Sequence, residues 1–493
     1  MPSTRSESGQ SRRRSARTGR RPFRIDHRQL GTGFLSLGVV GGLLGALLSL
    51  SLRGAPPWLG GTAADPALLA TFHGLLLVMF CALPILVGGF GNWFLPVMAG
   101  AADNVAPRVS VASLAAAVVG IVALGTGIAA SGSSPSWSSS AVAVALICWS
   151  LSFLLGAGGS LATILCGRAS GVALHHLPVF AWCQLATALL GVLTVPVLLA
   201  HLFLHLLRGT FDPVVAGHFF ALPQMALVLL PALGVMSAIV PTFAGRLPRL
   251  SRTSAYASLL AAAGVGALWA RAAMTTGRPP EGTVPAVCTA MLIAAGAVTL
   301  LGWGATLRGG RALPRVPLLW AMGFVVLAAT GFVATLAGLM AGSPLASAAS
   351  FASARLHDGV LLSAVCAGCG GFYYWIGKMS GRGYPEALAR LQFWLFFVGS
   401  ELTFLPALGA GPTGTPIAPA GQASGLAVLR SLSWNGTLLS VASAFVFLLV
   451  LVVLLVRPKA VAANPWGAGA VGREWSLPSP LPRQIDRPGA IPA

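Results

Sequence analysis

The chain has 493 residues, of which 56% are hydrophobic and only 9% are charged, and its mean hydropathy is +0.82. A soluble protein of this size carries roughly a quarter charged residues, so this composition excludes a soluble globular protein and indicates a helical membrane protein. The net charge is +20, but nine of the 31 basic residues lie in the first 28 positions and most others lie between hydrophobic segments. This distribution is typical of membrane orientation, and no nucleic-acid partner is expected.

The first 30 residues form a basic, Ser-rich segment that no short apolar stretch with a cleavage site follows. We therefore interpret residues 1–30 as a disordered cytoplasmic tail and not as a signal peptide. Residues 31–458 are predicted to form one membrane domain without internal repeats. Residues 459–493 are Pro/Gly-rich and form a second cytoplasmic tail, which we expect to be disordered from residue 460 onward.

Hydrophobic runs long enough to cross a bilayer number about 12. The predicted fold class is therefore all-α, a polytopic membrane bundle of about 12 transmembrane helices. Gly and Ala are abundant within the runs, which permits close helix packing in lipid. The predicted spans are residues 33–52, 67–98, 109–131, 140–166, 177–206, 214–243, 254–276, 284–306, 316–341, 348–376, 388–410 and 434–456.

Basic residues between the spans predict the topology. If the N-terminus is cytoplasmic, the outer loops hold few basic residues, chiefly Arg208, Arg278 and Arg430. This bias agrees with both termini on the cytoplasmic side of a bacterial inner membrane. The cytoplasmic loops and tail then hold Arg108, Arg168, Arg246, Arg249, Arg252, Arg308, Arg311, Arg315, Lys378, Arg382, Arg390, Arg457, Lys459, Arg473, Arg483 and Arg487.

Two histidines lie within the predicted spans at similar depth. His73 is about seven residues into the second span and His357 about nine into the tenth, and both spans run from outside to inside. At 1.5 Å per residue, both lie roughly 10–14 Å below the outer end. Ionisable side chains in a bilayer usually face the bundle interior with a partner. Two imidazoles facing each other are the ligand set of a six-coordinate, low-spin haem iron, whereas the alternative is a pair of core histidines that bind no metal.

Other reactive side chains have simpler interpretations. Cys366 and Cys369 form a C-x-x-C pair inside an apolar helix, where small packing residues are a better interpretation than a metal or redox site. Glu401 and Asp358 are intramembrane acids without an assigned partner. Three further histidines lie near the outer helix ends, namely His201, His205 and His218. His201 and His205 are at i, i+4, which permits a metal site, but all three fit interfacial positions better. His175 and His176 are expected at the opposite interface.

The segment around His73 reads TFHGLLLVMFCALPILVGGFGNWFLPVMAGAADNVAPR. This specific motif closely resembles the second helix of subunit I of the haem–copper oxidases, the catalytic subunit of cytochrome c oxidase. The resemblance implies that His73 is an axial ligand of a low-spin haem, that His357 is the other ligand, and that Arg53 contacts a substituent of the haem ring. It extends from about residue 30 to 456 through the segments 219–245, 269–277, 303–310, 354–375 and 396–406.

The departures from the family pattern fall on the oxygen-reducing centre. The sixth helix carries Leu222, Gln224 and Ala226 where the family has a copper ligand, a proton-relay acid and a cross-linked tyrosine, respectively. The two copper-ligand histidines of the seventh helix fall on Arg271 and Ala272, and the axial ligand of the oxygen-binding haem falls on Arg355. The lysine of one proton channel, the propionate arginines and the magnesium ligands fall on Thr299, Ile417, Ala418, Ser347 and Ala348.

These departures predict a degenerate active site. Copper needs several imidazole-type ligands, which leucine and alanine lack, and a protonated guanidinium has no lone pair for a metal. Asp103 and Asn92 match the mouth of a second proton channel, but its receiving acid is Gln224, which cannot titrate. We therefore expect no copper and no coupled proton pumping. Arg271 and Arg355 either fill the vacated cavity beside a carboxylate or anion, or extend to the surface.

The resulting hypothesis is a subunit I-like membrane protein that holds one low-spin haem, of a or b type, between His73 and His357. Its role would be electron transfer or a structural function beside other respiratory oxidase subunits, such as a subunit II-like protein. The first alternative is an active terminal oxidase with a rebuilt metal site. The second is a cofactor-free assembly or regulatory protein.

Overall fold

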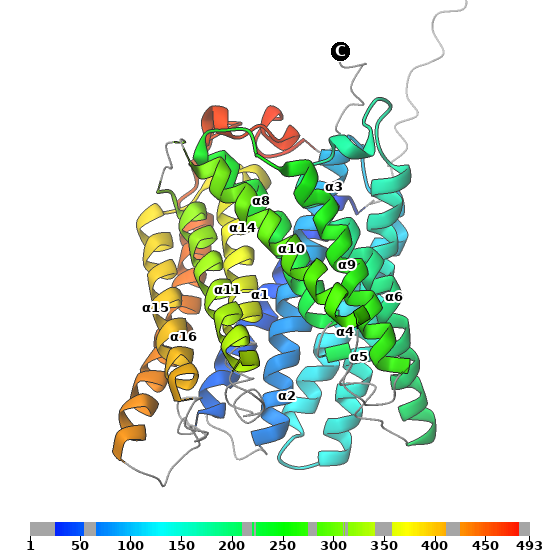
Figure 1. Ribbon diagram of the computed structural model, residues 1–493, viewed down its shortest axis with the longest axis vertical. Coiled ribbons are helices and arrows are strands. Elements are labelled where there is room, and N and C mark those ends of the chain that lie inside the picture. Colours follow the sequence, from blue (N-terminus) through cyan, green and yellow to red (C-terminus); the bar gives the residue numbers. More distant parts are fainter. Residues whose placement is uncertain are drawn as a thin grey trace, which may run out of the picture.

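The computed structural model describes residues 25–53, 66–209, 219–220, 223–274, 283–308, 310, 314–340, 357–410 and 424–482. Long, roughly parallel helices form an upright bundle (Figure 1). Eleven of the described helices are long and apolar enough to cross a membrane, and a shorter apolar stretch in one more helix covers Ala294–Leu307. The predicted all-α membrane bundle of about 12 spans is thereby confirmed.

The first half of the chain supplies helices that alternate in direction through the bundle. The second span is not one regular helix, because two π-helical turns interrupt it. The elements are α1 (His27–Leu52), α2 (Pro66–Leu77), η2 (Val78–Ala82), η3 (Pro84–Gly89), α3 (Phe90–Ala99), α4 (Pro107–Ala129), α5 (Pro135–Cys166), the short η4 (Leu174–His176) and α6 (Val179–Arg208).

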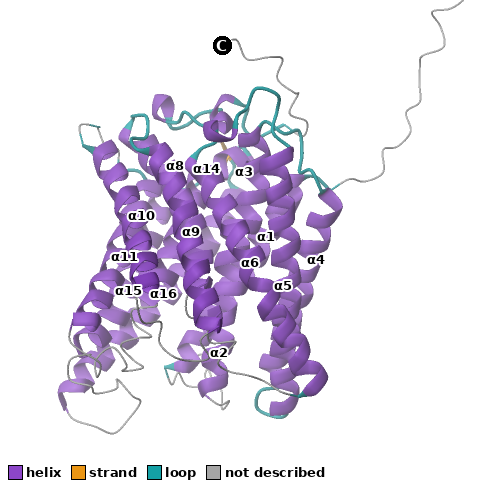
Figure 2. Ribbon diagram, turned by 45° about the vertical axis from the view of Figure 1, so that its right-hand side comes forward, coloured by secondary structure: helices purple, strands orange, loops and turns teal. Residues whose placement is uncertain are grey.

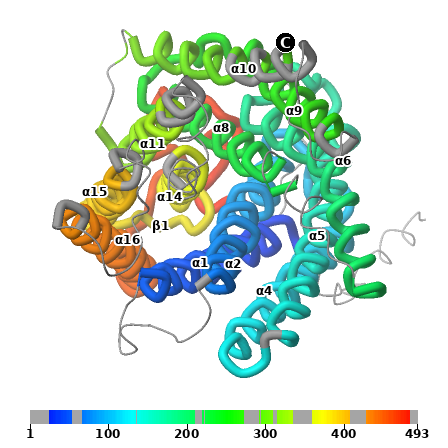
Figure 3. The backbone as a smooth tube through the Cα atoms, turned by 60° about the horizontal axis from the view of Figure 1, so that its bottom comes forward, coloured from blue at the N-terminus to red at the C-terminus, as the bar shows by residue number. Residues whose placement is uncertain are grey.

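The second half repeats this pattern and ends in a short, irregular segment. Its elements are α8 (Pro223–Ala244), α9 (Ser251–Met274), α10 (Thr283–Leu307), α11 (Val316–Met340), η5 (His357–Leu362), α14 (Ser363–Ser380), β1 (Arg382–Gly383), α15 (Glu386–Ala410), α16 (Ser424–Val456), β2 (Lys459–Ala460), η7 (Gly467–Gly469) and η8 (Arg473–Ser476). The span formed by η5 and α14 lies inside the bundle beside α8 and α11 (Figure 3).

Local sequence explains where the first helix begins. Asp26 caps α1 by accepting hydrogen bonds from the backbone N–H groups of Arg28 and Gln29, and the Gln29 side chain accepts one from the Asp26 N–H. Such a capping box satisfies donors that the first turn of a helix leaves unpaired. The α1 helix therefore starts inside the predicted N-terminal tail, whose residues 1–24 lie outside the described part of the chain.

Both ends of the described chain lie at one end of the bundle, which we call the terminal face. The Arg28 guanidinium donates a hydrogen bond to the Leu481 carbonyl, and most of the described loops gather at this end (Figure 2). The strands β1 and β2 pair there in antiparallel fashion. The expected disorder from residue 460 onward is wrong for residues 460–482, because they pack across the terminal face; residues 483–493 lie outside the description.

Lys378 also differs from its predicted place in a cytoplasmic loop. It lies in the last turn of α14 and its side chain is fully buried. A buried ammonium group needs hydrogen-bond acceptors and a countercharge, and residues of the C-terminal segment supply both, as described below. The C-terminal segment is rich in Pro and Gly, and this composition predicts a solvated tail and not a segment that covers Lys378.

Candidate functional site

His73 lies in α2 and is half-buried, one turn before the first π-helical turn. Its ring Nδ1 is 2.9 Å from the carbonyl oxygen of Gly45 in α1. A carbonyl can only accept a hydrogen bond, so Nδ1 carries the proton, and in the neutral imidazole Nε2 then carries the lone pair. This is the tautomer that a metal-binding imidazole adopts when its second nitrogen is oriented by a backbone carbonyl.

Glycines in α1 make this contact possible. A Cβ on Gly45 would lie 2.7 Å from Leu77 Cδ2, and a Cβ on Gly41 would collide with the Phe80 carbonyl. Because neither residue has a side chain, α1 approaches the span of His73 closely enough for the Gly45 carbonyl to reach the ring. The close approach of two helices through small residues is a general mode of packing in membranes.

The π-helical turns place both predicted haem ligands beside irregular backbone. Val78–Ala82 and Pro84–Gly89 follow His73, and the π-helical turn His357–Leu362 begins at the second histidine. Single π-turns occur frequently at functional sites because they rotate the residues on either side relative to each other. The buried Gln184 side chain in α6 donates a 2.8 Å hydrogen bond to the Leu86 carbonyl and stabilises the second turn.

The structure supports part of the predicted ligand set. It gives the position of His357 as the first residue of η5, but the side chain of His357 is not among those described. The facing arrangement of the two rings therefore remains a prediction. Arg53 caps the C-terminal end of α1, donates a hydrogen bond to Ser433 Oγ and lies 5.9 Å from the Phe404 ring centroid. Its contact with a haem substituent also remains a prediction.

The positions that are predicted to have lost copper or haem ligands carry no suitable donor among the residues described. Ala226 lies on α8 and Arg271 near the end of α9, whereas Leu222, Arg355 and His218 lie outside the description. Within the described part of the chain, no group of three or more His, Cys, Asp or Glu residues could hold a metal ion. A methyl group and a guanidinium do not fit copper. The expected absence of copper nevertheless stays a prediction.

The cysteine pair has neighbours typical of packing residues. Cys366 is fully buried, and Cys369 Sγ accepts a hydrogen bond from the Gln392 amide at 3.7 Å. The side-chain oxygen Oε1 of Gln392 in turn accepts a 2.5 Å hydrogen bond from the Tyr373 hydroxyl. Both thiols are free, which agrees with the interpretation that they fill space between α14 and α15.

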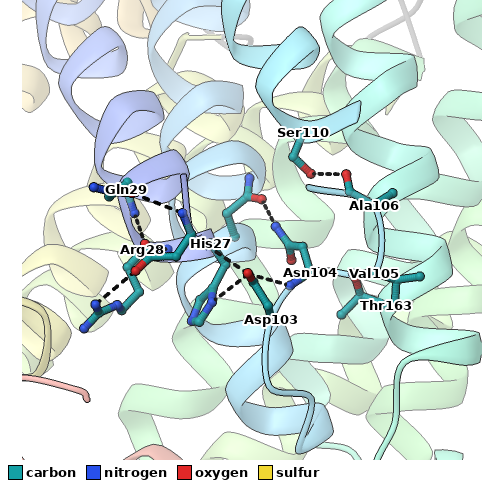
Figure 4. A network of polar contacts seen from close by, with 11 residues as sticks. His27, Arg28, Gln29, Asp103, Asn104, Val105, Ala106, Ser110 and Thr163 are labelled. Atoms are coloured by element: carbon teal, nitrogen blue, oxygen red, sulfur yellow. Dashed lines mark hydrogen bonds and ion pairs between the residues drawn. The ribbon is translucent and has the colours of Figure 1, made fainter. Parts of the chain in front are cut away.

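The acid predicted at a proton-channel mouth is held in a polar network at the terminal face (Figure 4). Asp103 Oδ1 accepts hydrogen bonds from the backbone N–H and Nδ1 of His27, both at 3.1 Å, and from the Asn104 N–H at 2.8 Å. The Asn104 amide donates to Asn92 at 2.7 Å. Burial acts to raise the pKa of Asp103, but the hydrogen bonds from His27 and Asn104 outweigh it and lower the pKa.

The fold and this site define an integral membrane protein in which a backbone carbonyl orients an imidazole between closely packed helices. Comparison with known proteins identifies the family. The sequence model of "Cytochrome C and Quinol oxidase polypeptide I" matches residues 29–456. Cytochrome c oxidase subunit 1 of Cereibacter sphaeroides is 33% identical over 456 residues, which cover 84% of this chain and 79% of the relative. The chain therefore belongs to the cytochrome c and quinol oxidase subunit I family of respiratory electron transport.

Sequence reasoning identified this family correctly, but it missed three features of the site. The Gly45 carbonyl contact, the π-helical turns and the residues that cover the terminal face were not predicted. Pro84 and the Gly88–Gly89 pair were a signal for irregular backbone within the second span. No pattern in the sequence indicates which carbonyl contacts His73, because that contact depends on the register between two helices.

Proposed function

We propose that this protein holds one low-spin haem between His73 and His357 and transfers electrons, or acts structurally, within a respiratory oxidase complex of a bacterial inner membrane. The observation that carries the proposal is the hydrogen bond between His73 Nδ1 and the Gly45 carbonyl. It leaves Nε2 as the nitrogen with a lone pair, as axial ligation requires. Both termini then lie in the cytoplasm, and a subunit II-like protein is the expected partner.

The haem, when bound, supplies a one-electron redox couple that needs no open coordination site. The protein's own residues hold it and exclude water. The Gly45 carbonyl fixes the His73 tautomer, and the neighbouring Phe72 and Leu76 are fully buried and make the surroundings apolar. Burial and hydrogen bonding around a haem are the factors by which a protein sets its reduction potential.

We further propose that the chain neither reduces dioxygen nor pumps protons. Ala226 and Arg271 offer no copper ligand, and the neutral Gln224 stands where a proton-relay acid is expected. Asp103, at the expected channel mouth, accepts three hydrogen bonds from neighbouring residues. Oδ1 accepts all three, and this engagement supports a structural role for the carboxylate.

The competing function is an active terminal oxidase with a rebuilt metal site, and the family membership of the chain favours it. Haem and copper content of the purified protein, with reduced-minus-oxidised spectra before and after carbon monoxide, decide between the two. One haem per chain, no copper and no spectral shift with carbon monoxide are expected. Two haems, bound copper or a carbon monoxide shift would contradict the proposal and favour the oxidase.

The His73→Ala variant tests the ligand assignment. The loss of one axial imidazole is expected to abolish the low-spin spectrum, whereas His175→Ala, at an exposed histidine of η4, should leave the spectrum unchanged. An unaltered low-spin spectrum in His73→Ala would show that the haem has other ligands.

A further inference from the structure

The segment of residues 459–482, here called the C-terminal strap, is fastened to the terminal face along its length. Its Val461 N–H donates to the Gly381 carbonyl at 3.3 Å, and its Leu481 N–H donates to the Lys378 carbonyl at 3.1 Å. Between these points, Gly469 packs so closely on the Thr242 carbonyl of α8 that a Cβ there would collide with it. The strap crosses the ends of α8 and α14 at the top of the bundle in Figure 1.

Two buried charged residues join the strap to the bundle. The Lys378 ammonium donates hydrogen bonds to the carbonyls of Ala463 and Leu477 at 2.5 and 2.7 Å and lies 5.2 Å from the Trp475 ring centroid. Glu474, only 2% exposed, accepts a 3.4 Å hydrogen bond from Trp375 Nε1. Burial raises the pKa of Glu474, and the positive charge of Lys378 acts in the opposite direction. The two groups lie too far apart for a direct ion pair, but the charge of each lowers the cost of burying the charge of the other.

The same contacts connect the two spans that carry the predicted haem ligands. Trp375 belongs to the span of His357. Its ring stacks on Phe94 with 4.4 Å between the ring centroids, and its centroid lies 5.2 Å from that of Phe90. Phe90 and Phe94 lie on α3, which continues the span of His73. The Arg473 side chain of the strap also packs on Gly100, where α3 ends. The strap thus contacts the ends of both spans.

We propose that Lys378 and Glu474 are positioning residues, which latch the C-terminal strap across the ends of these spans and so fix the rotation and depth at which His73 and His357 are presented. This inference rests on the proposed haem site. The histidines lie roughly 30 Å from the latch at 1.5 Å per residue. Well-packed helices transmit displacement over such distances because their interiors are hardly compressible.

The first experiment measures hydrogen exchange in the full-length protein in nanodiscs. In Lys378→Met and in Glu474→Gln, strap amides are expected to exchange about tenfold faster, because each change leaves the other charge buried alone. The double variant should exchange more slowly than either single variant. The matched control is the partly exposed Glu386–Arg390 ion pair of α15, at 3.2 Å, where Glu386→Gln and Arg390→Met should change strap exchange less than about twofold.

The second readout concerns the far ends of the spans. Exchange of residues 69–77 and 357–365 should rise in the single variants, and the electron paramagnetic resonance g-values and midpoint potential of the low-spin haem should shift. The exchange rates, the g-values and the midpoint potential should all return toward their wild-type values in the double variant and in the conservative Lys378→Arg variant. If the Lys378 variants fail to fold, Gly469→Ala, which pushes the strap away from Thr242, serves as an independent release of the strap.

The outcomes separate the two proposals. Unchanged strap exchange in the single variants overturns the latch, and a released strap without any change at residues 69–77 and 357–365 overturns the positioning role. Wild-type protein without haem would overturn the proposed function alone, since the exchange of the two spans still reports whether the latch controls them.

Discussion

At His73, a carbonyl oxygen 28 positions away in the chain determines which ring nitrogen holds the proton. Sequence could indicate the histidine, because an imidazole within an apolar span is rare and functional by default. It could not indicate Gly45 as the partner, since α1 carries several glycines and only the packed register selects one. The sequence also indicates Asp103 as an acid at a channel mouth, but not its hydrogen bonds with His27, because these residues are 76 positions apart.

The Gly45→Val variant tests the close approach at His73. The added side chain would overlap Leu77, so α1 should move away and the hydrogen bond between the Gly45 carbonyl and the His73 ring should break. Overpacking of this kind costs about 1–3 kcal/mol. We expect haem content, measured by pyridine haemochrome assay, to fall by about half or more. Gly125→Val on α4, where nothing lies within 4 Å of an added Cβ, is the control and should keep its haem.

The Asp103 network predicts a pH dependence of stability. Folding lowers the pKa of Asp103 below its ordinary value of 3.8. Its contribution, about 1–3 kcal/mol for hydrogen bonds to a charged group, is therefore fully present above about pH 4 and is lost as the pH falls through the lowered value. Thermal melts of wild type and Asp103→Asn should differ most above pH 4 and converge in more acidic buffer. A difference that does not depend on pH would contradict this assignment.

At the scale of elements, hydropathy predicts long, uniform helices well and interrupted ones poorly. The predicted span 316–341 agrees closely with α11, Val316–Met340. The predicted span 434–456 misses the first ten residues of α16, which begins at Ser424. Those residues include polar groups that lower the hydropathy, but Ser433 is buried and donates to the Thr403 carbonyl while accepting from Arg53. Tertiary hydrogen bonds therefore extend the helix beyond its apolar core.

The π-helical turn at His357 yields a prediction at the same scale. A π-turn contains one residue more than the α-helix around it requires, so deletion of Gly359 should convert η5 to regular helix. This conversion should leave the rotation of His357 relative to α14 nearly unchanged, because the π-turn had absorbed the deleted residue, and the low-spin haem absorbance should largely persist. Deletion of Ala364 from the regular helix α14 absorbs nothing, so it should rotate His357 by about 100° and reduce the absorbance strongly. Equal loss of absorbance in both deletion variants would contradict this interpretation of the π-turn.

For the whole molecule, the family, the membrane bundle and the approximate order of spans follow from the sequence, whereas the closure of the terminal face does not. Residues 459–482 have a Pro/Gly-rich composition typical of disordered tails, yet Trp475 and Leu481 are buried within them. The contacts that order the segment join residues far apart in the chain, such as Trp375 and Glu474, which are 99 positions apart. A pattern confined to neighbouring residues contains no information about such pairs.

Truncation of the chain tests how much the strap stabilises the bundle. A stop after Pro458 removes the buried side chains of Trp475 and Leu481 and exposes Lys378, and burial of a large apolar side chain contributes about 1.5–3 kcal/mol. We expect a lower thermal midpoint in detergent for this variant. A stop after Pro482 removes only residues beyond the described strap and should leave the midpoint within about 2 °C of wild type. Equal midpoints for both truncations would show that the strap adds no stability.

The contact between Arg28 and the Leu481 carbonyl also orders events in time, because 453 positions separate the two residues. Synthesis at about 5–20 residues per second delays the arrival of Leu481 by roughly 20–90 s after Arg28 leaves the ribosome. The α1 helix is made at the start of that interval and α14 near its end, about a hundred residues before Leu481, and the end that they share stays uncovered until the strap follows. The residues that complete the terminal face are therefore translated after every described membrane helix, and synthesis that stops between α16 and the strap leaves a bundle with these helices but with an open end.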